Sequence, residues 1–461
     1  FYCYISWHYS FLDIPKITTM RDAKLFFTKV KFLNGELMKI KFLVQNVIIT
    51  LIIYTFPIYA QQTDSVITLD RLVNTMLKEN QALNSVSKSI EALKQKIPQM
   101  GTLPDPKLTI GVSNLPIDTY KFDQEPMTQK IIGITQSIPF LGKLGFREDI
   151  ALKDYEIQNA RLNNFELCLT KNMEHLYYQL YFNYKSLEIM NKNKNLLSDF
   201  VKIASTKYST GKGIQQDVLK SQVELLKIDR KLIELNQKYE SIESQINVLL
   251  NRLPQEKLGM PQELNIPSVR FNLDSLQNIA IINNPQLLAQ KIKIDKSNLE
   301  YNLANREYWP DFGLTVNYGQ RENHPDFISG LLSINIPLYA GSKQSKKVQE
   351  AALMHEAAKY SFNDAVNKMR NNVKVIADEI QKNKDLSDLY QNGILPQAQQ
   401  ALESAIAAYR TDKVDFITLL NNQLTLLNHE MEYYKILSDH NSNLSDLAFI
   451  CGVRLQEIIQ I

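Results

Sequence analysis

The segment at residues 130–147 reads K-I-I-G-I-T-Q-S-I-P-F-L-G-K-L-G-F-R. It alternates apolar and polar residues, meets a proline, turns at a glycine and enters a long run of helical composition. The same order of features returns at residues 328–347, I-S-G-L-L-S-I-N-I-P-L-Y-A-G-S-K-Q-S-K-K, with Ile336 placed 198 residues after Ile138. Two copies of one strand-to-helix junction indicate that the architecture is duplicated.

Long helices are predicted by the distribution of glycine and proline. The 461 residues contain only 15 glycines and 16 prolines, and these cluster at a few places. None occurs between Gly145 and Gly211, a run that would be about 100 Å long as a helix at 1.5 Å per residue. A turn at residues 209–213 and a second run back to Pro254 predict a helical hairpin. The net charge of +3 gives no electrostatic footprint for nucleic acid.

A second hairpin is predicted from Ser342 to Ile450, with a local break at Gly393 and Pro396. Its tip, Y-R-T-D-K at residues 409–413, mirrors Y-S-T-G-K at residues 208–212. We therefore predict two repeats, at residues 61–253 and 268–461, joined by a proline-rich linker at residues 254–267.

The N-terminal residues carry a predicted export signal. Residues 38–60 combine a short basic region, an apolar core and Ala60 before Gln61, as in a secretory signal peptide. An N-terminal membrane anchor is the alternative, although Gln45, Asn46 and Pro57 interrupt the apolar run. Residues 1–37 show no fold logic, and we expect them to be a non-native upstream extension.

Four short strands are predicted at residues of about 107–115, 130–139, 311–319 and 328–338. Each has bulky apolar residues on one face and small or polar residues on the other. The alternation is typical of a barrel with a lipid-facing exterior and a wet lumen, but a water-soluble sheet would show it too. Four strands cannot close a barrel, and open edges are not tolerated in lipid. If the strands span a membrane, several copies must share one barrel.

Over residues 66–452, the chain resembles the outer-membrane efflux channel family typified by TolC. The resemblance rests on the duplication, on the two strand pairs flanked by helices, and on the junctions I-P-F-L-G-K-L at 138–144 and I-P-L-Y-A-G-S-K at 336–343. The tips are similar to the family's Tyr-x-x-Gly, although the second has Asp412 in place of glycine. The run D-P-K-L-T-I-G-V-S-N-L-P at 105–116 looks most like the heavy-metal efflux branch.

The resemblance implies a mainly α fold with a small β part. Duplicated helical hairpins would form a periplasmic α-barrel, and four strands per chain would contribute to a shared transmembrane β-barrel. It implies a homotrimer in the outer membrane of a Gram-negative bacterium, with a periplasmic adaptor and a proton-driven inner-membrane pump as partners. The function would be passive export of metal ions or small toxic compounds. The alternative is a periplasmic coiled-coil structural or adaptor protein without a membrane barrel.

The hairpin tips are the predicted aperture. Counting from the tip tyrosines, Asp217 stands at the family's first acidic position, while the second repeat has Thr418 there, so Asp412 and Asp415 would substitute. The alternative is that these are solvated tip charges or helix-end residues. The predicted aperture residues are Tyr208, Gly211, Asp217, Tyr409, Arg410, Asp412 and Asp415. The predicted strand-to-helix junction residues are Pro139, Gly142, Pro337 and Gly341.

No catalytic constellation can be assembled from the sequence. His355-Glu356 and His429-Glu430 begin like a zinc-protease motif, but Lys359 and Tyr433 occupy the position of its second histidine. The six histidines are scattered without ligand spacing. We therefore predict a protein that is not an enzyme and has no cofactor and no metal site.

Overall fold

The computed structural model describes residues 66–267 and 271–459. They lie in one compact unit, residues 64–461. The predicted signal peptide at 38–60 and the predicted extension at 1–37 fall outside the described residues. Among the described helices, none is long and apolar enough to cross a membrane.

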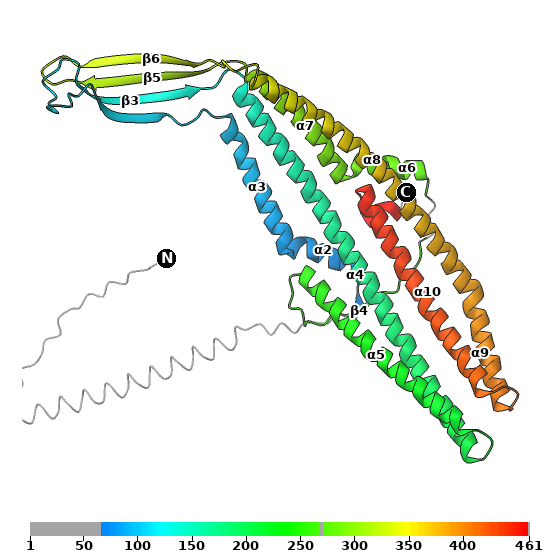
Figure 1. Ribbon diagram of the computed structural model, residues 1–461. Helices are drawn as coiled ribbons and strands as arrows, with labels where there is room; N and C mark the ends of the chain where they lie inside the picture. Colours follow the sequence, from blue (N-terminus) through cyan, green and yellow to red (C-terminus); the bar gives the residue numbers. More distant parts are fainter. Residues whose placement is uncertain (1–65, 268–270, 460–461) are drawn as a thin grey trace, which may run out of the picture. The chain divides into compact units, whose positions relative to one another are not determined.

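The elements of the unit repeat in the same order twice, each time as two short helices, two strands and a long helical hairpin (Figure 1). The fold is thus mainly α with a small β part, as predicted. The first repeat contains α2 (Leu69–Glu79), α3 (Gln81–Gly101), β2 (Lys107–Ser113), β3 (Gln129–Ile138), α4 (Lys143–Ser209) and α5 (Gln215–Leu249). The second contains α6 (Leu273–Asn283), α7 (Pro285–Arg306), β5 (Asp311–Gln320), β6 (Phe327–Asn335), α8 (Gln344–Leu389), η1 (Tyr390–Ile394), α9 (Leu395–Arg410) and α10 (Phe416–Cys451).

A buried asparagine makes equivalent hydrogen bonds in each repeat. Asn80 Oδ1 accepts from the Leu83 amide at the start of α3, and its Nδ2 donates to Leu249 O at the end of α5 over 3.1 Å. Asn284 Oδ1 accepts from two amides at the start of α7, and its Nδ2 donates to Ile450 O near the end of α10 over 2.9 Å. Each side chain therefore caps one helix and ties it to the end of its hairpin.

The four strands of the two repeats form one antiparallel sheet in the order β2-β3-β5-β6. The central pair, β3 and β5, joins the two repeats, with Ile134 opposite Val316. Within the described part of the chain, β2 pairs only with β3 and β6 only with β5, so the sheet has two open edges.

The two faces of the sheet differ as the alternation predicts. One face carries a band of exposed apolar side chains from all four strands: Leu108, Ile110, Ile132, Ile134, Leu314, Val316, Ile328, Leu332 and Ile334. The other face is mostly small and polar, with Ile131, Phe327 and Leu331 as apolar exceptions. There Thr135 Oγ1 and Thr315 Oγ1 lie 2.9 Å apart, and Ser333 Oγ donates to Gly313 O over 3.2 Å.

The hairpin helices pack side by side, with α4 against both α5 and α10, and α10 against α8 and α9. Helix α4 has 67 residues and is therefore about 100 Å long. Pro98 lies inside α3, three residues before its last residue, Gly101. The expected break at Gly393 is a π-helical turn, η1, which widens the helix without ending it.

The tyrosines at residues 177–181 pack between elements. Tyr177 is buried, its hydroxyl donates to Ile67 O over 3.1 Å, and it accepts from the Gln262 amide over 2.9 Å. These partners flank the short parallel pair β1 (Val66–Ile67) and β4 (Met260–Pro261). The linker at 254–267 is therefore fastened to the side of α4.

A buried carboxyl group lies on the same stretch of α4. Burial raises the pKa of Glu174 to about 7, against the opposing effect of a hydrogen bond from Ser445. His175 lowers this pKa, whereas Asp70 and Asp446 raise it. Tyr178 also interacts with this carboxyl.

We predict that Glu174→Gln makes the stability of the protein less sensitive to a rise in pH from 4.5 to about 7. A folded-state pKa above the unfolded value contributes stability below pH 4.5 that is lost as pH rises through about 7. The loss is of the order of 3 kcal/mol, and glutamine removes it because it cannot ionise. The measurement is the free energy of unfolding between pH 4.5 and 8.5. An equally steep fall in wild type and Glu174→Gln, or an equal change in the control Glu166→Gln, contradicts the prediction.

Candidate functional site: the tips of the helical hairpins

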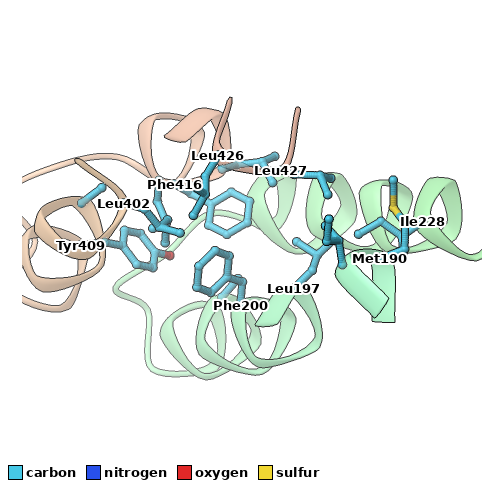
Figure 2. Close-up of a cluster of buried hydrophobic side chains, with 14 of the residues drawn as sticks. Met190, Leu197, Phe200, Ile228, Leu402, Tyr409, Phe416, Leu426 and Leu427 are labelled. Carbon is cyan, nitrogen blue, oxygen red and sulfur yellow. The ribbon is translucent and has the colours of Figure 1, made fainter. Parts of the chain in front are cut away.

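The tips are held by a shared apolar core. The ends of α4 and α9 and the starts of α5 and α10 bury one cluster of side chains (Figure 2). Phe200 of α4 lies in it close to Phe416 of α10, whose ring meets the ring of Tyr409 edge-on at 5.8 Å. The two hairpins are therefore packed on each other down to their last turns.

Both tips make the same backbone turn. Gly211 has φ of +71° and Asp412 has φ of +56°. The next amide in each turn reaches back over the helix end, from Lys212 to Lys207 O over 2.8 Å and from Lys413 to Ala408 O over 2.9 Å. This is a left-handed helix-capping turn, which glycine adopts without strain and aspartate tolerates better than most residues. Asp412 thus replaces the family's glycine without changing the fold of the tip.

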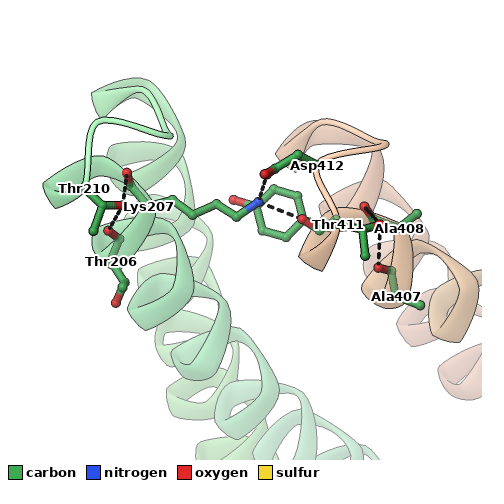
Figure 3. A network of polar contacts seen from close by, with 8 residues as sticks. Thr206, Lys207, Thr210, Ala407, Ala408, Thr411 and Asp412 are labelled. Atoms are coloured by element: carbon green, nitrogen blue, oxygen red, sulfur yellow. Dashed lines mark hydrogen bonds and ion pairs between the residues drawn. The ribbon is translucent and has the colours of Figure 1, made fainter.

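One lysine connects the two tips (Figure 3). Lys207, in the last turn of α4, donates to Tyr409 O over 2.7 Å and forms an ion pair with the Asp412 carboxylate. Its ammonium also lies 4.1 Å from the centre of the Tyr409 ring. Lys207 holds the pKa of Asp412 below its usual value, first through the hydrogen bond and then through its charge.

The other predicted aperture residues have diverse surroundings. Tyr409 is core, at 5% exposure, whereas Tyr208, its counterpart, is 49% exposed. Asp415 caps α10 by accepting from the Thr418 amide over 2.8 Å. Asp217 is half-buried in the first turn of α5, and desolvation followed by repulsion from Asp415 raises its pKa. Arg410 is exposed.

The first predicted junction is built from both repeats. Gly142 has φ of +90° and caps α4, so glycine is required there. Phe140 stacks on Trp309 at 5.1 Å, and the Phe140 amide donates to Asp311 Oδ1 over 2.8 Å. The buried Lys143 ammonium binds the same oxygen over 2.7 Å. The segment that follows Pro139, between β3 and α4, is thus anchored on the start of β5.

Within residues 66–267 and 271–459, the second junction shows no such anchor. Leu338 and Tyr339, which follow Pro337, are exposed. Gly341 does not adopt the left-handed conformation of Gly142. The two junctions therefore share a sequence pattern and differ in their contacts.

Lys207 and Asp311 were not predicted from the sequence as residues of the site. Lys207 precedes a tip tyrosine, but its counterpart in the second tip is Ala408, so the internal repeat gives no signal for it. Asp311 follows Trp309-Pro310 and was read only as the start of a strand. Both act through residues more than 160 positions away in the chain.

We predict that Lys207→Met loosens both tips. It removes the ion pair with Asp412 and the hydrogen bond to the Tyr409 carbonyl, while methionine keeps most of the side-chain volume. With about 1 kcal/mol lost at this partly exposed site, amide exchange in residues 204–218 and 404–418 should accelerate about five-fold. The control is Lys202→Met, because Lys202 pairs with Asp199 on its own helix, over 3.0 Å, and not with the other tip among the described residues. Equal exchange in both variants contradicts the prediction.

Comparison with known proteins gives three concordant results. Residues 72–252 and 276–453 match the family described as "Outer membrane efflux protein". The chain is 19% identical over 407 residues to the cobalt-zinc-cadmium resistance protein CzcC of Cupriavidus metallidurans, covering 86% of this chain and 92% of that protein.

The fold is similar to those of several solved proteins. CusC superposes with a TM-score of 0.73 at 14% identity, over 84% of this chain and 92% of that chain. The outer membrane protein VceC of Vibrio cholerae superposes with a TM-score of 0.71 at 13% identity, over 84% and 96%. The family resemblance predicted from the sequence is confirmed.

Proposed function

Because the chain belongs to the outer membrane efflux protein family, we propose that it is the exit duct of a tripartite efflux system. It is an outer-membrane protein with a large periplasmic extension. Its proposed task is passive: cargo delivered by an inner-membrane pump leaves the cell through a pore that several copies of the chain enclose. We assign it no catalytic activity, and substrate choice and energy would come from the partners.

The observation that carries this proposal is the sheet. Its exposed apolar band fits lipid, and its small, polar face fits a wet lumen. The free N–H and C=O groups of β2 and β6 must find partners there, since lipid offers none. Three copies would close a barrel of about twelve strands, within the range of known barrels.

The sequence pattern of the two edge strands favours their pairing. In the internal pairs, apolar residues stand opposite apolar residues, as Ile110 does opposite Ile132. Setting Ile334 of β6 opposite Ile110 of a second copy's β2 keeps both apolar rows on one face. A slip by one residue would put them on opposite faces.

The helices offer a matching edge. Leu219, Leu226 and Ile233 repeat every seven residues along α5 and are 53%, 66% and 71% exposed. A stripe of this period is what a neighbouring helix packs against in a coiled coil. Helix α5 contacts α4, while α8 and α9 contact α10, so α5 and α8–α9 form opposite edges of the hairpin layer. Copies of the chain can therefore join edge to edge through helices and strands alike.

We place the aperture and the adaptor contact at the hairpin tips. Helix α4 puts Tyr208 and Gly211 about 100 Å from the junction at Gly142. A pump in the inner membrane would meet this end first, through a periplasmic adaptor. Repeated around a threefold axis, Asp217, Asp412 and Asp415 would concentrate negative charge there and favour cations.

Metal ions are the cargo class we favour. CzcC, whose name refers to cobalt, zinc and cadmium resistance, is similar to this chain along nearly its whole length. Within residues 66–267 and 271–459, no group of three or more histidine, cysteine, aspartate or glutamate side chains could hold a metal ion. The proposed selectivity therefore rests on pore size and charge.

The sequence also allowed a periplasmic structural or adaptor protein. That alternative does not explain the apolar band on the sheet. Cell fractionation separates the two hypotheses. The duct requires the protein to be extracted from outer membranes by detergent, whereas a structural protein would be released with the periplasm.

We predict that deleting the gene sensitises the cell to its cargo. Growth would be measured with cobalt, zinc and cadmium salts and, in parallel, with dyes, bile salts and antibiotics. Sensitivity to the metals alone supports metal cargo, and sensitivity to the organic compounds alone rejects metal cargo and keeps the duct. Unchanged growth in every condition counts against export.

We predict that Asp412→Asn with Asp415→Asn lowers the cation preference of single channels. Asparagine tolerates the left-handed backbone of position 412 and preserves the helix cap at position 415. The change removes the ion pair between Asp412 and Lys207, while Lys207 keeps its hydrogen bond to Tyr409 O. The readout is the reversal potential in a salt gradient across a planar bilayer. A control pair, Asp364→Asn with Asp378→Asn on α8, should leave it unchanged. An unaltered reversal potential in the tip variant removes both aspartates from the aperture.

A further inference from the structure

Charged residues are almost absent from the four strands of the sheet. Strands β2, β3, β5 and β6 together contain three of them, namely Lys107, Lys130 and Asp311. A charged side chain in a membrane-spanning segment is costly where it meets lipid, whereas one that faces a water-filled lumen tunes selectivity. The surroundings of each charge therefore show which of the three is free to act on a passing ion.

Two of the three charges have a partner of opposite sign. The Asp311 carboxylate binds the Lys143 ammonium over 2.7 Å and belongs to the first junction. Lys130 lies on the apolar face of β3, two residues before Ile132, and its ammonium lies 3.9 Å from the Glu322 carboxylate. Both charges are therefore accounted for by contacts within the chain.

Lys107 differs from the other two in both face and partners. It stands opposite Thr135, which stands opposite Thr315, and Leu331 completes this row across the sheet. The hydroxyl oxygens of Thr135 and Thr315 lie 2.9 Å apart on the polar face, so Lys107 is on the polar face too. Its side chain is exposed, and within the described residues its ammonium makes no ion pair or hydrogen bond.

The strand that the proposed barrel sets beside Lys107 has no carboxylate to offer. That strand is β6 of the next copy, and it contains no charged residue from Phe327 to Asn335. Asp105, two residues before Lys107 in the chain, is exposed and forms no ion pair with it. Because it precedes β2, its charge would act on the periplasmic side of the Lys107 row. An ion that enters the barrel would therefore still meet the lysine as a charge of its own.

We propose that the Lys107 side chains of three copies form a cationic ring in the lumen of the shared barrel, which holds back free cations and favours anions. The inference rests on the proposed function, which supplies the barrel. Lys107 is the first residue of β2, so the ring would lie at the junction end of the sheet. The acidic tips, at the far end of the long helices, would favour cations. The duct would thus carry fixed charges of opposite sign at two levels.

The dimensions of such a barrel allow the ring to act on every passing ion. About twelve strands, spaced by about 4.8 Å and tilted by about 40°, give a backbone radius of about 12 Å. A lysine side chain reaches about 6 Å from its Cα, so each ammonium would lie about 6 Å from the barrel axis. Ions on the axis would feel all three charges, because this separation is less than the screening length of about 8 Å at physiological salt. The ring would lower the cation concentration on the axis about fivefold.

Substitution of Lys107 tests the ring in the full-length protein, reconstituted in planar bilayers. The readout is the permeability ratio of potassium to chloride, taken from the reversal potential in a KCl gradient. Lys107→Gln removes the charge and should raise this ratio about twofold, since the ring is one section of a long pore. Lys107→Glu should raise it further, and Lys107→Arg, which keeps the charge, should leave it at the wild-type value. The matched control is Lys130→Gln, which removes a lysine from the apolar face of the same sheet and should not change the ratio.

The outcomes separate the inference from the proposed function. A higher ratio in Lys107→Gln, with the wild-type ratio in Lys130→Gln, supports the ring. Conducting channels whose ratio does not change in Lys107→Gln, or changes equally in the control, overturn the ring and leave the duct in place. A Lys107→Gln protein that no longer assembles also overturns the ring, because the lysine then has a structural contact. Wild-type protein that forms no channels overturns both, because no shared barrel then exists.

Discussion

Backbone hydrogen bonding at the edges of the sheet is the constraint on which the rest of the structure depends. A four-stranded antiparallel sheet satisfies its inner strands and leaves two rows of N–H and C=O groups open, on β2 and β6. In water these rows would be solvated, but beside an apolar exterior they need other strands. In the proposed shared barrel, the contact between the two repeats inside one chain, β3 with β5, would be the pattern for the contact between chains. The helices follow the same plan, with an apolar stripe left open on α5.

The large features of this fold could be read from the sequence because they rest on periodic signals. Alternation over about ten residues places each strand, and the absence of glycine and proline from residues 146–210 places α4. The duplication doubles each signal, so that Pro139 and Pro337 support each other. The strand ends differ by up to three residues from their expected positions, as at Asn335, since a strand ends where its partner ends and the partner is not visible in a linear pattern.

The contacts at the tips and junctions could not be predicted in this way. Lys207 binds Asp412 and Lys143 binds Asp311 only because two hairpins and two strands from different repeats lie side by side. Charged residues are common on the long helices, and nothing local separates these lysines from the solvated ones. The tip aspartates were identified as candidates by position alone. The structure adds that Asp415 caps a helix and Asp412 holds a lysine, so each has a structural role whether or not it also lines an aperture.

The π-helical turn at Tyr390–Ile394 changes the direction in which the side chains beyond it face. Residues 143–209 and residues 344–410 are equal in number, 67 each, but only the second set contains this wider turn. A π-helical turn contains about one residue more than an α-helical turn. The residues that follow it are therefore shifted by one position, or roughly 100° around the helix axis. Matching residues near the two ends are thereby out of phase, in keeping with Tyr409 pointing into the core while Tyr208 faces outward. One widened turn thus lets two segments of equal length present dissimilar surfaces at their ends, and a ring built from them alternates two kinds of contact along its rim.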